Sequence, residues 1–529
     1  MTGWRSYLTY GNVQWSALAL VAAALPWNNV AVSNAQFLLI GAWLAEGVHQ
    51  RDLWGRFRRA FTDRWALLFI SIFLLHVIGL FWTQDLEWGL DLCRILLPIL
   101  VFGTILPAMP ALTERGMWGI LLTGAYSVVL STVACMLLAH DRLALGDYRG
   151  VSMFISHIRL GLLLCMAVAV LVVHRPGRKG LRVLQLLAVS WALAFMWMVG
   201  SLSGAGALMA TAFALGWWRA GMLTGTPRWV VRGTLVGLLA AGAWSIIHLV
   251  TDGPPPRPLD PEALPERSVG GERYYHDPQD PQSENGHYVW IEVADRELER
   301  GWSRASKVPF LGRDRRGQPL RSTLVRYLAS MGTTKDSVGL AQLTPEDVRR
   351  IEAGVSDVRT GRRGLLLTRI DQLRMELDRY RVTGDPNGHS LTMRFEFWRT
   401  GLQIAREHLW TGVGTGDTRP AFAEMYDRTG SRLALEWRHR AHNEYLTLLI
   451  SFGVFGMLWA VLAFLLPAWG LKAYRAPVFI AWAAIFTVSC LTEDTIETQV
   501  GATFFAFYYA LLVFGARRIN AERPPRSTA

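Results

Sequence analysis

Long apolar runs alternate with short polar connections along most of the chain. Twelve apolar segments can be read from the sequence, and each predicts a membrane helix, although several are shorter than the roughly 20 residues that cross a bilayer. They lie near residues 13–29, 31–48, 65–82, 91–107, 116–138, 155–174, 182–199, 203–218, 233–250, 444–471, 477–491 and 500–516. The pattern therefore predicts an all-α polytopic membrane protein with about 12 transmembrane helices.

One long polar stretch, residues 251–441, interrupts this pattern between the ninth and tenth apolar segments. Helices are predicted within it over residues 343–355, 363–381 and 391–410. Thr344, Pro345 and Asp347 match the capping box that begins a helix. We therefore expect one large, mainly helical domain, which is entered through the proline-rich sequence DGPPPRPLDPEALPERS.

The distribution of basic residues predicts the orientation of the chain. With the N-terminus in the cytoplasm, the inner connections carry 20 Lys and Arg residues, and the short outer connections carry two, Arg142 and Arg149. This is the positive-inside bias of membrane proteins. It predicts that both termini are cytoplasmic and that the polar domain faces outward. The predicted parts are 1–250 (helices 1–9), 251–441 (the outer domain), 442–516 (helices 10–12) and 517–529 (a cytoplasmic tail).

The composition supports this class and narrows the partners. Hydrophobic residues make up 51% of the chain and charged residues 18%, and the mean hydropathy is +0.22. The net charge of +12 is explained mostly by the inner connections, so we predict membrane lipids and no nucleic acid as partners. The four cysteines all lie in apolar segments, which argues against a disulfide framework or a zinc-binding spacing.

Three clusters of polar residues flank the apolar segments, and the predicted topology places all three on the outer side. They are SHIRLG with His157 and Arg159; SLTMRFEFW with Arg394, followed by Arg399; and RHRAHNEY with His442, Asn443 and Tyr445, which we group with LTEDTIETQ and its Glu493, Asp494 and Glu497. Arg159 stands out because a charge in or beside an apolar segment is costly and tends to mark a functional site. The structural alternative is that such arginines extend to lipid headgroups and that His442 caps a helix.

Two further features bear on anion binding. Arginine accounts for 50 of the 54 basic residues, and guanidinium holds phosphate through two parallel hydrogen bonds. A glycine-rich turn, TGVGTGD, follows the predicted helix over residues 391–410. Its backbone amides can form an anion-binding nest, and a plain turn is the alternative.

The third cluster and its neighbours carry a family resemblance. AHNEYLTLLISFGVFG resembles the histidine-bearing signature of the O-antigen ligase and polymerase superfamily, H-[NS]-x-[YF]-L before a span with spaced glycines. SLTMRFEFWRTGLQIAREHLWTGVGTGDTRPAF resembles its R-x-x-x-W stretch, LTEDTIETQVGATFFAFYYALL its acidic C-terminal pattern, and FISHIRLGLLL its earlier arginine-bearing span. The resemblance is strongest over residues 390–512. In GSLSGAGALMA, Leu202 stands where the family often has arginine, so Arg159 is expected to take over that phosphate-binding role.

The resemblance implies a GT-C-like fold and a metal-independent, cofactor-free glycosyltransferase. The implied reaction moves a glycan from an undecaprenyl-diphosphate donor to a sugar hydroxyl of lipid A-core, at the periplasmic face of the bacterial inner membrane, with inversion at the anomeric carbon. His442 is the implied base, and Arg394, Arg159 and Arg399 are implied to bind the diphosphate. The implied acceptor-binding or orienting residues are Asn443, Tyr445, Glu493, Asp494, Glu497 and His157.

Three alternatives stay open. An O-antigen or exopolysaccharide polymerase would use a lipid-linked repeat as its acceptor, and a protein O-oligosaccharyltransferase would use a protein serine. Polymerases of the superfamily often divide their polar mass between two outer loops, whereas this chain has one, which favours the ligase. A small-anion transporter is the alternative from a different class, but we find no internal repeat in the sequence.

Overall fold

The computed structural model describes residues 9–139, 141–142, 148, 150–251, 260–280, 282–359 and 365–522. Predictions for the proline-rich residues 252–259, for Arg149 and for residues 523–529 of the tail lie outside these ranges. The chain forms two compact units. The first holds residues 1–139, 149–238 and 394–529, and the second holds residues 140–148 and 239–393.

The first unit contains the apolar helices. They are α1 (Tyr10–Ala24), α2 (Asn29–His49), α4 (Arg64–Gly79), α5 (Leu86–Ala108), α6 (Glu114–Leu138), α8 (His157–Val173), α9 (Lys179–Val199), α10 (Leu202–Ala220), α11 (Thr226–Thr251, which continues into the second unit), α19 (Glu444–Gly470), α20 (Pro477–Thr492) and α21 (Gln499–Ala510). Each predicted apolar segment overlaps one of these helices. The unit also contains α3 (Leu53–Thr62), α17 (Ser390–Glu407, which begins in the second unit), α18 (Thr418–Arg428), α22 (Arg517–Glu522), the 3₁₀-helices η1 (Leu80–Trp82), η3 (Leu435–Trp437) and η4 (Ala473–Arg475), and the π-helix η5 (Leu511–Gly515).

Six helices of the described chain are long and apolar enough to cross a membrane. They are α4 with η1 (Arg64–Trp82), α5, α6, α9, α11 and α19. Three more, α8, α20 and α21 with η5, are apolar but shorter. These helices are consistent with an all-α membrane protein, whereas the number of about 12 spans stays a prediction.

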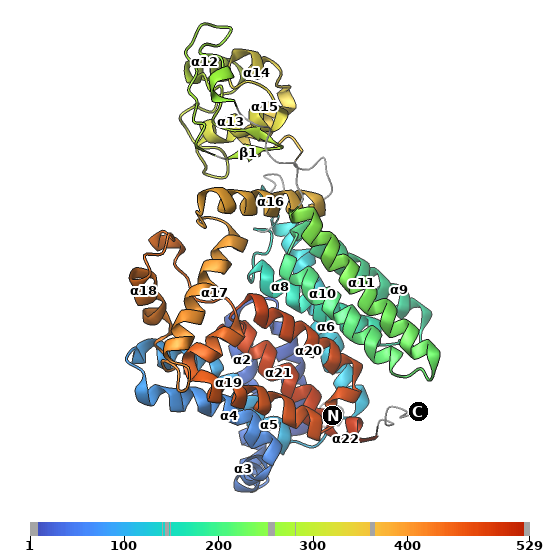
Figure 1. Cartoon of the computed structure of the whole chain (residues 1–529). Coiled ribbons are helices and arrows are strands. Elements are labelled where there is room, and N and C mark those ends of the chain that lie inside the picture. Colours follow the sequence, from blue (N-terminus) through green and yellow to red (C-terminus); the bar gives the residue numbers. More distant parts are fainter. Residues whose placement is uncertain are drawn as a thin grey trace. The chain divides into compact units, whose positions relative to one another are not determined.

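Two helices form the centre of the first unit. In α8 every residue from Leu160 to Leu171 is buried, and in α21 every residue from Val500 to Ala510 is buried. Helix α8 packs against α6, α9, α10 and α20, and α21 packs against α2, α5 and α20 (Figure 1). A helix that is buried all round must be apolar on every face, which is why neither segment shows an amphipathic stripe.

The second unit is built from short elements around its own core. They are η2 (Pro261–Ala263), the antiparallel strands β1 (Ser283–Glu284) and β2 (His287–Tyr288), and the helices α12 (Asp295–Ala305), α13 (Leu320–Met331), α14 (Ser337–Ala341), α15 (Pro345–Glu352) and α16 (Leu365–Thr383). Trp302, Leu324 and Ile351 are fully buried in the core. The predicted capping box of α15 is confirmed, since Thr344 and Asp347 exchange both hydrogen bonds.

Residues 394–441 group with the apolar helices of the first unit. The sequence predicts that they belong to the outer domain, because they precede the tenth apolar segment. Helix α17 overlaps the predicted helix over 391–410, and α18 follows it. The polar residues predicted to carry chemistry therefore all belong to one compact unit.

Candidate functional site

Helix α19 is broken in its middle, and the segment after α17 fills the break. Gly453 has a φ of 63° and ψ of −170°, which interrupts the helix. The backbone N–H of Val413 donates to the carbonyl of Ile450 at 2.9 Å. A Cβ on Gly453 would lie 2.3 Å from the carbonyl oxygen of Trp410, so the close approach requires glycine.

The turn TGVGTGD holds this arrangement together. Its amides already donate to protein oxygens: Gly412 to His408, Val413 to Ile450, Gly414 to Ser451, Thr415 to Gly79, and Gly416 to the hydroxyl of Thr83. The Asp417 carboxylate accepts from the backbone N–H groups of Gln84 and Asp85 at 2.8–3.0 Å. The turn therefore fastens α19 to the connection between α4 and α5, and these amides are not free to form an anion-binding nest.

His442 lies in a strained turn directly before α19. Its φ of 46° is in the left-handed region, which costs a non-glycine residue roughly 1–2 kcal/mol. The next residue, Asn443, caps α19 by accepting from the N–H of Leu446 at 3.1 Å. The Asn443 backbone N–H and the Thr447 hydroxyl both donate to Asp494, at 3.1 and 2.9 Å. Asp494 thus holds the turn that presents His442.

Glu493 lies between this histidine and an arginine of α17. One of its carboxylate oxygens is 3.7 Å from Nδ1 of His442, an ion-pair distance that is longer than a hydrogen bond. The other is 3.3 Å from the guanidinium of Arg394, which also donates to the carbonyl of Thr492 at 3.3 Å. A carboxylate at this side of the ring favours the tautomer with its proton on Nδ1, which leaves Nε2 free to accept a proton.

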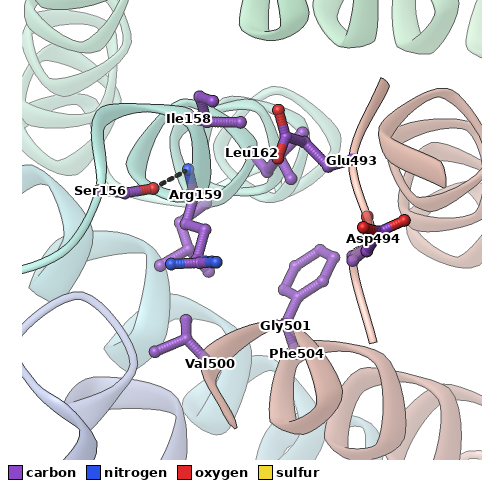
Figure 2. Close-up of a pocket in the computed structure, with 11 residues that line it drawn as sticks. Ser156, Ile158, Arg159, Leu162, Glu493, Asp494, Val500, Gly501 and Phe504 are labelled. Carbon is purple, nitrogen blue, oxygen red and sulfur yellow. Dashed lines mark hydrogen bonds between the residues drawn. The ribbon is translucent and has the colours of Figure 1, made fainter. Parts of the chain in front are cut away.

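Arg159 shares a pocket with the same acidic pair. The pocket has a cavity volume of about 30 Å³ and is lined by Arg159, Glu493, Asp494, Phe504 and seven further residues (Figure 2). Ser156 caps α8 beside it by accepting from the backbone N–H of Arg159 at 3.5 Å. The first and third polar clusters of the sequence therefore meet at one pocket.

Arg440 is a member of this site that the sequence analysis did not single out. Its guanidinium forms ion pairs with Glu497 and, at 3.9 Å, with Asp494. Burial lowers the pKa of Arg440, and the charge of Asp494 counteracts this shift. Within RHRAHNEY nothing distinguishes Arg440 from Arg438, because the carboxylates that Arg440 contacts come from a distant part of the chain.

A second histidine, His439, packs beside His442. The two imidazole rings have their centroids 5.9 Å apart, and Phe397 of α17 lies 5.9 Å from His439 and 5.8 Å from His442. Burial lowers the pKa of His439, and the neighbouring His442 lowers it further. These two effects favour the neutral form of His439 over its charged form.

Three predicted residues have other surroundings. His157 lines a different small pocket, against α9 and the start of α10. Arg399 is exposed on α17, and because it follows Arg394 by five positions it is turned by about 140° around the helix axis. The Tyr445 hydroxyl donates to the carbonyl of Thr487 at 3.1 Å, which joins α19 to α20.

These features are consistent with an all-α membrane protein in which arginines, a histidine and carboxylates converge at the start of α19. The family model described as O-antigen ligase matches residues 364–461, from the beginning of α16 through the break in α19. The match confirms the resemblance to the O-antigen ligase superfamily, whose members are glycosyltransferase-like enzymes. It includes Arg394 and His442, whereas Arg159 and Glu493 lie outside it. No curated protein matches the chain.

Proposed function

We propose that the chain is an O-antigen ligase-like inverting glycosyltransferase. The donor is a glycan on undecaprenyl diphosphate, and the acceptor is a sugar hydroxyl of lipid A-core at the periplasmic face of the inner membrane. One observation carries this proposal: His442 and Arg394 both approach Glu493, and Glu493 shares a pocket with Arg159. The family match over residues 364–461 supports it.

In the proposed reaction the acceptor oxygen forms a bond to the anomeric carbon while the bond from that carbon to the diphosphate oxygen breaks. His442 accepts the hydroxyl proton through Nε2 as this bond forms, because a hydroxyl is a poor nucleophile until its proton is removed. The diphosphate leaves with the bonding electron pair. Direct displacement of this kind inverts the anomeric carbon.

The arginines stabilise the leaving group. Negative charge grows on the diphosphate as it departs, and fixed guanidinium groups lower the energy of that state. We assign this role to Arg159 in the pocket and to Arg394 beside Glu493. Arg399, which is exposed and turned away from Arg394 around α17, is left out of this assignment. Because the protein's own cations neutralise the charge, the proposal needs no metal ion.

The remaining polar residues position the base. Asp494 accepts hydrogen bonds from Asn443 and Thr447 and so fixes the turn of His442. Arg440 forms ion pairs with both Asp494 and Glu497. Glu493 orients the imidazole. Tyr445 acts only through the contact between α19 and α20.

The test is a transfer assay with the purified full-length protein, an undecaprenyl-diphosphate glycan and lipid A-core, with and without a chelator. We expect glycan attached to lipid A-core through an inverted linkage, at a rate that the chelator does not change. Elongated lipid-linked glycan would identify a polymerase, and attachment to a serine peptide an oligosaccharyltransferase. Uptake of a small anion into proteoliposomes without any glycan transfer would identify a transporter.

The orientation belongs to the same proposal. Both termini are placed in the cytoplasm and the pocket of Arg159 faces the periplasm, because the basic residues gather in the inner connections. Single cysteines introduced at the exposed Arg58 and Arg399, labelled from either side of the membrane, check this assignment. We expect labelling of position 399 from outside and of position 58 only after the membrane is opened.

A further inference from the structure

A second arginine site lies at Trp88, near the start of α5. The guanidinium carbon of Arg419, the second residue of α18, lies 3.4 Å from the ring centroid of Trp88 in the first turns of α5. This is a close cation–π contact between the guanidinium and the ring. Arg419 is nevertheless exposed.

Arg419 and Arg440 lie over the same aromatic ring, but within the described chain only Arg440 has carboxylate partners. Arg440 also lies over Trp88, with its guanidinium carbon 5.4 Å from the ring centroid, but Arg440 is paired with Asp494 and Glu497. Among the residues that the structure describes, no carboxylate forms an ion pair with Arg419. Two like charges held near one aromatic ring repel each other, so an anion bound at Arg419 relieves that repulsion.

The beginning of α18 leaves polar groups without side-chain partners. Asp417 stands at the N-cap position but makes no side-chain cap, because its carboxylate is committed to Gln84 and Asp85. The backbone N–H groups in the first turn of α18 are therefore not capped by Asp417. Thr418, between Asp417 and Arg419, is 1% exposed, and its hydroxyl has no hydrogen-bond partner within the described chain.

This site is separate from the cations assigned to the donor. The route between them runs from Arg159 across the pocket to Asp494, from Asp494 to Arg440, and from Arg440 over Trp88 to Arg419. Carboxylates thus lie between the two groups of arginines. An enzyme that binds one diphosphate needs only one such group, and the second group fits a second anionic substrate.

We propose that Arg419, held by Trp88, binds a phosphate or carboxylate group on the acceptor. That the anion belongs to the acceptor rests on the proposed function. The anion site at Arg419 does not depend on that function. A planar guanidinium binds either group through two parallel hydrogen bonds. Arg419 is therefore a specificity-determining residue that selects acceptors with an anionic group near the reacting hydroxyl.

The first arm of the test measures binding alone, with full-length protein in neutral detergent and glucose 1-phosphate, glucuronate or glucose as probes. We expect the two anionic probes to bind more tightly than glucose. The change Arg419→Ala should weaken the affinity for both anionic probes by about tenfold. The affinity of Arg419→Lys should lie between those of the wild type and Arg419→Ala, because lysine keeps the charge but loses the planar pair of donors. The matched control is Arg406→Ala, an exposed arginine of α17, and it should bind as the wild type does.

The second arm measures transfer. Arg419→Ala should raise the KM for a phosphorylated acceptor about tenfold and leave the KM for the donor and kcat within about twofold. The wild type with phosphatase-treated acceptor should show the same raised KM. If Arg419→Ala loses binding of the anionic probes but the wild type transfers no glycan, the anion site stands and the proposed function is rejected.

Two results overturn the inference. One is equal binding of the anionic probes by the wild type and Arg419→Ala. The other is that Arg419→Ala binds the sugar probes normally but loses affinity for nanodiscs that contain phosphatidylglycerol, which would make the anion a lipid headgroup.

Discussion

At the residue scale, the arrangement of the site is set by which arginine pairs with which carboxylate. Glu493 approaches Arg394 and His442, and Arg440 is paired with Asp494 and Glu497. These pairings join α17, the turn before α19 and the connection between α20 and α21. A charge in this network therefore has a role that its position in the sequence does not reveal.

Variants of Arg394 and Arg399 compare a residue of the proposed diphosphate site with an exposed residue on the same helix. Arg394→Ala should lower the transfer rate about 100-fold, because it removes a cation from the developing charge of the leaving group. Arg399→Ala should change it by less than about threefold, since Arg399 is exposed on another face of α17. Initial rates in the purified system measure both. Equal losses in the two variants would contradict the assignment.

Substitutions of Arg440 and Glu497 should have non-additive effects on the free energy of unfolding, because the two side chains form an ion pair. Arg440→Met leaves two carboxylates that are less than a tenth exposed without their cation, and we expect a loss of about 3 kcal/mol in unfolding free energy. Adding Glu497→Gln removes one of these charges and should restore part of the loss. Unfolding of the single and double variants in detergent measures the coupling. A double variant that is less stable than Arg440→Met would refute the proposed balance of charge.

The sequence identifies part of this site in advance. His442, Arg394, Arg159 and Glu493 can be predicted as a set because each flanks an apolar segment on the same predicted side. The partners of Arg440 cannot be predicted in this way, because they depend on how α5, α19 and α21 pack. The exposure of Arg399 depends on the rotation of α17, which a spacing of five residues alone does not fix.

At the scale of elements, the apolar segments were predictable and their interruptions were not. Every predicted apolar segment overlaps a helix, because a long apolar run can satisfy its backbone in a membrane only as a helix. The capping box of α15 could be read from three residues. In contrast, the basic connection 51–64 contains the helix α3, in which Arg56 is buried and paired with Glu46 at 2.8 Å. That long-range pair leaves no local signal in the sequence.

The break in α19 joins this helix to the segment that follows α17. SFGVFG reads as a continuous span, yet Gly453 is left-handed there and admits the segment around Trp410. Gly453→Ala should destabilise the protein by about 3 kcal/mol or more, because the new methyl group meets backbone atoms that cannot move aside. Gly237→Ala in α11, where an added Cβ meets nothing within 4 Å, is the matched control.

Thermal unfolding of the two glycine variants in detergent measures this difference. We expect a lower transition temperature for Gly453→Ala and an unchanged or higher one for Gly237→Ala, since alanine favours a helix more than glycine does. Equal transition temperatures would show that the break in α19 is not needed for stability.

At the scale of the whole molecule, the two compact units have different cores. The first is built from apolar helices, and the second has a small core around Trp302 and Tyr327 with buried polar groups at its edge. Among these groups, Lys335 is 4% exposed and donates from Nζ to the carbonyl of Tyr288 at 2.8 Å. The family model matches residues 364–461 and so does not extend to this second core.

Lys335 makes the stability of the second unit depend on pH. Burial lowers its pKa from 10.5 to about 8, and the charges of Glu292 and Asp336 oppose the shift. Between these values the unfolded chain binds more protons than the folded one, so stability should rise with pH by up to about 2 kcal/mol from pH 8 to pH 9.5. Well below pH 8 both states are protonated and the slope vanishes. Hydrogen exchange of peptides from α13, corrected for the intrinsic rate, reports this change.

Lys335→Met is the control for that experiment. It removes the titrating group, so the rise in protection between pH 8 and pH 9.5 should disappear. The same rise in the variant would assign the effect to another group.

The central claim is that His442 is the base of a glycan transfer, and one comparison tests it most directly. The transfer rate from undecaprenyl-diphosphate glycan to lipid A-core is measured for the wild type, for His442→Ala and for His408→Ala, an exposed histidine just beyond α17. We predict a loss of about 100-fold or more for His442→Ala, with an unchanged unfolding temperature, and a normal rate for His408→Ala. Transfer by folded His442→Ala at the wild-type rate would contradict the claim.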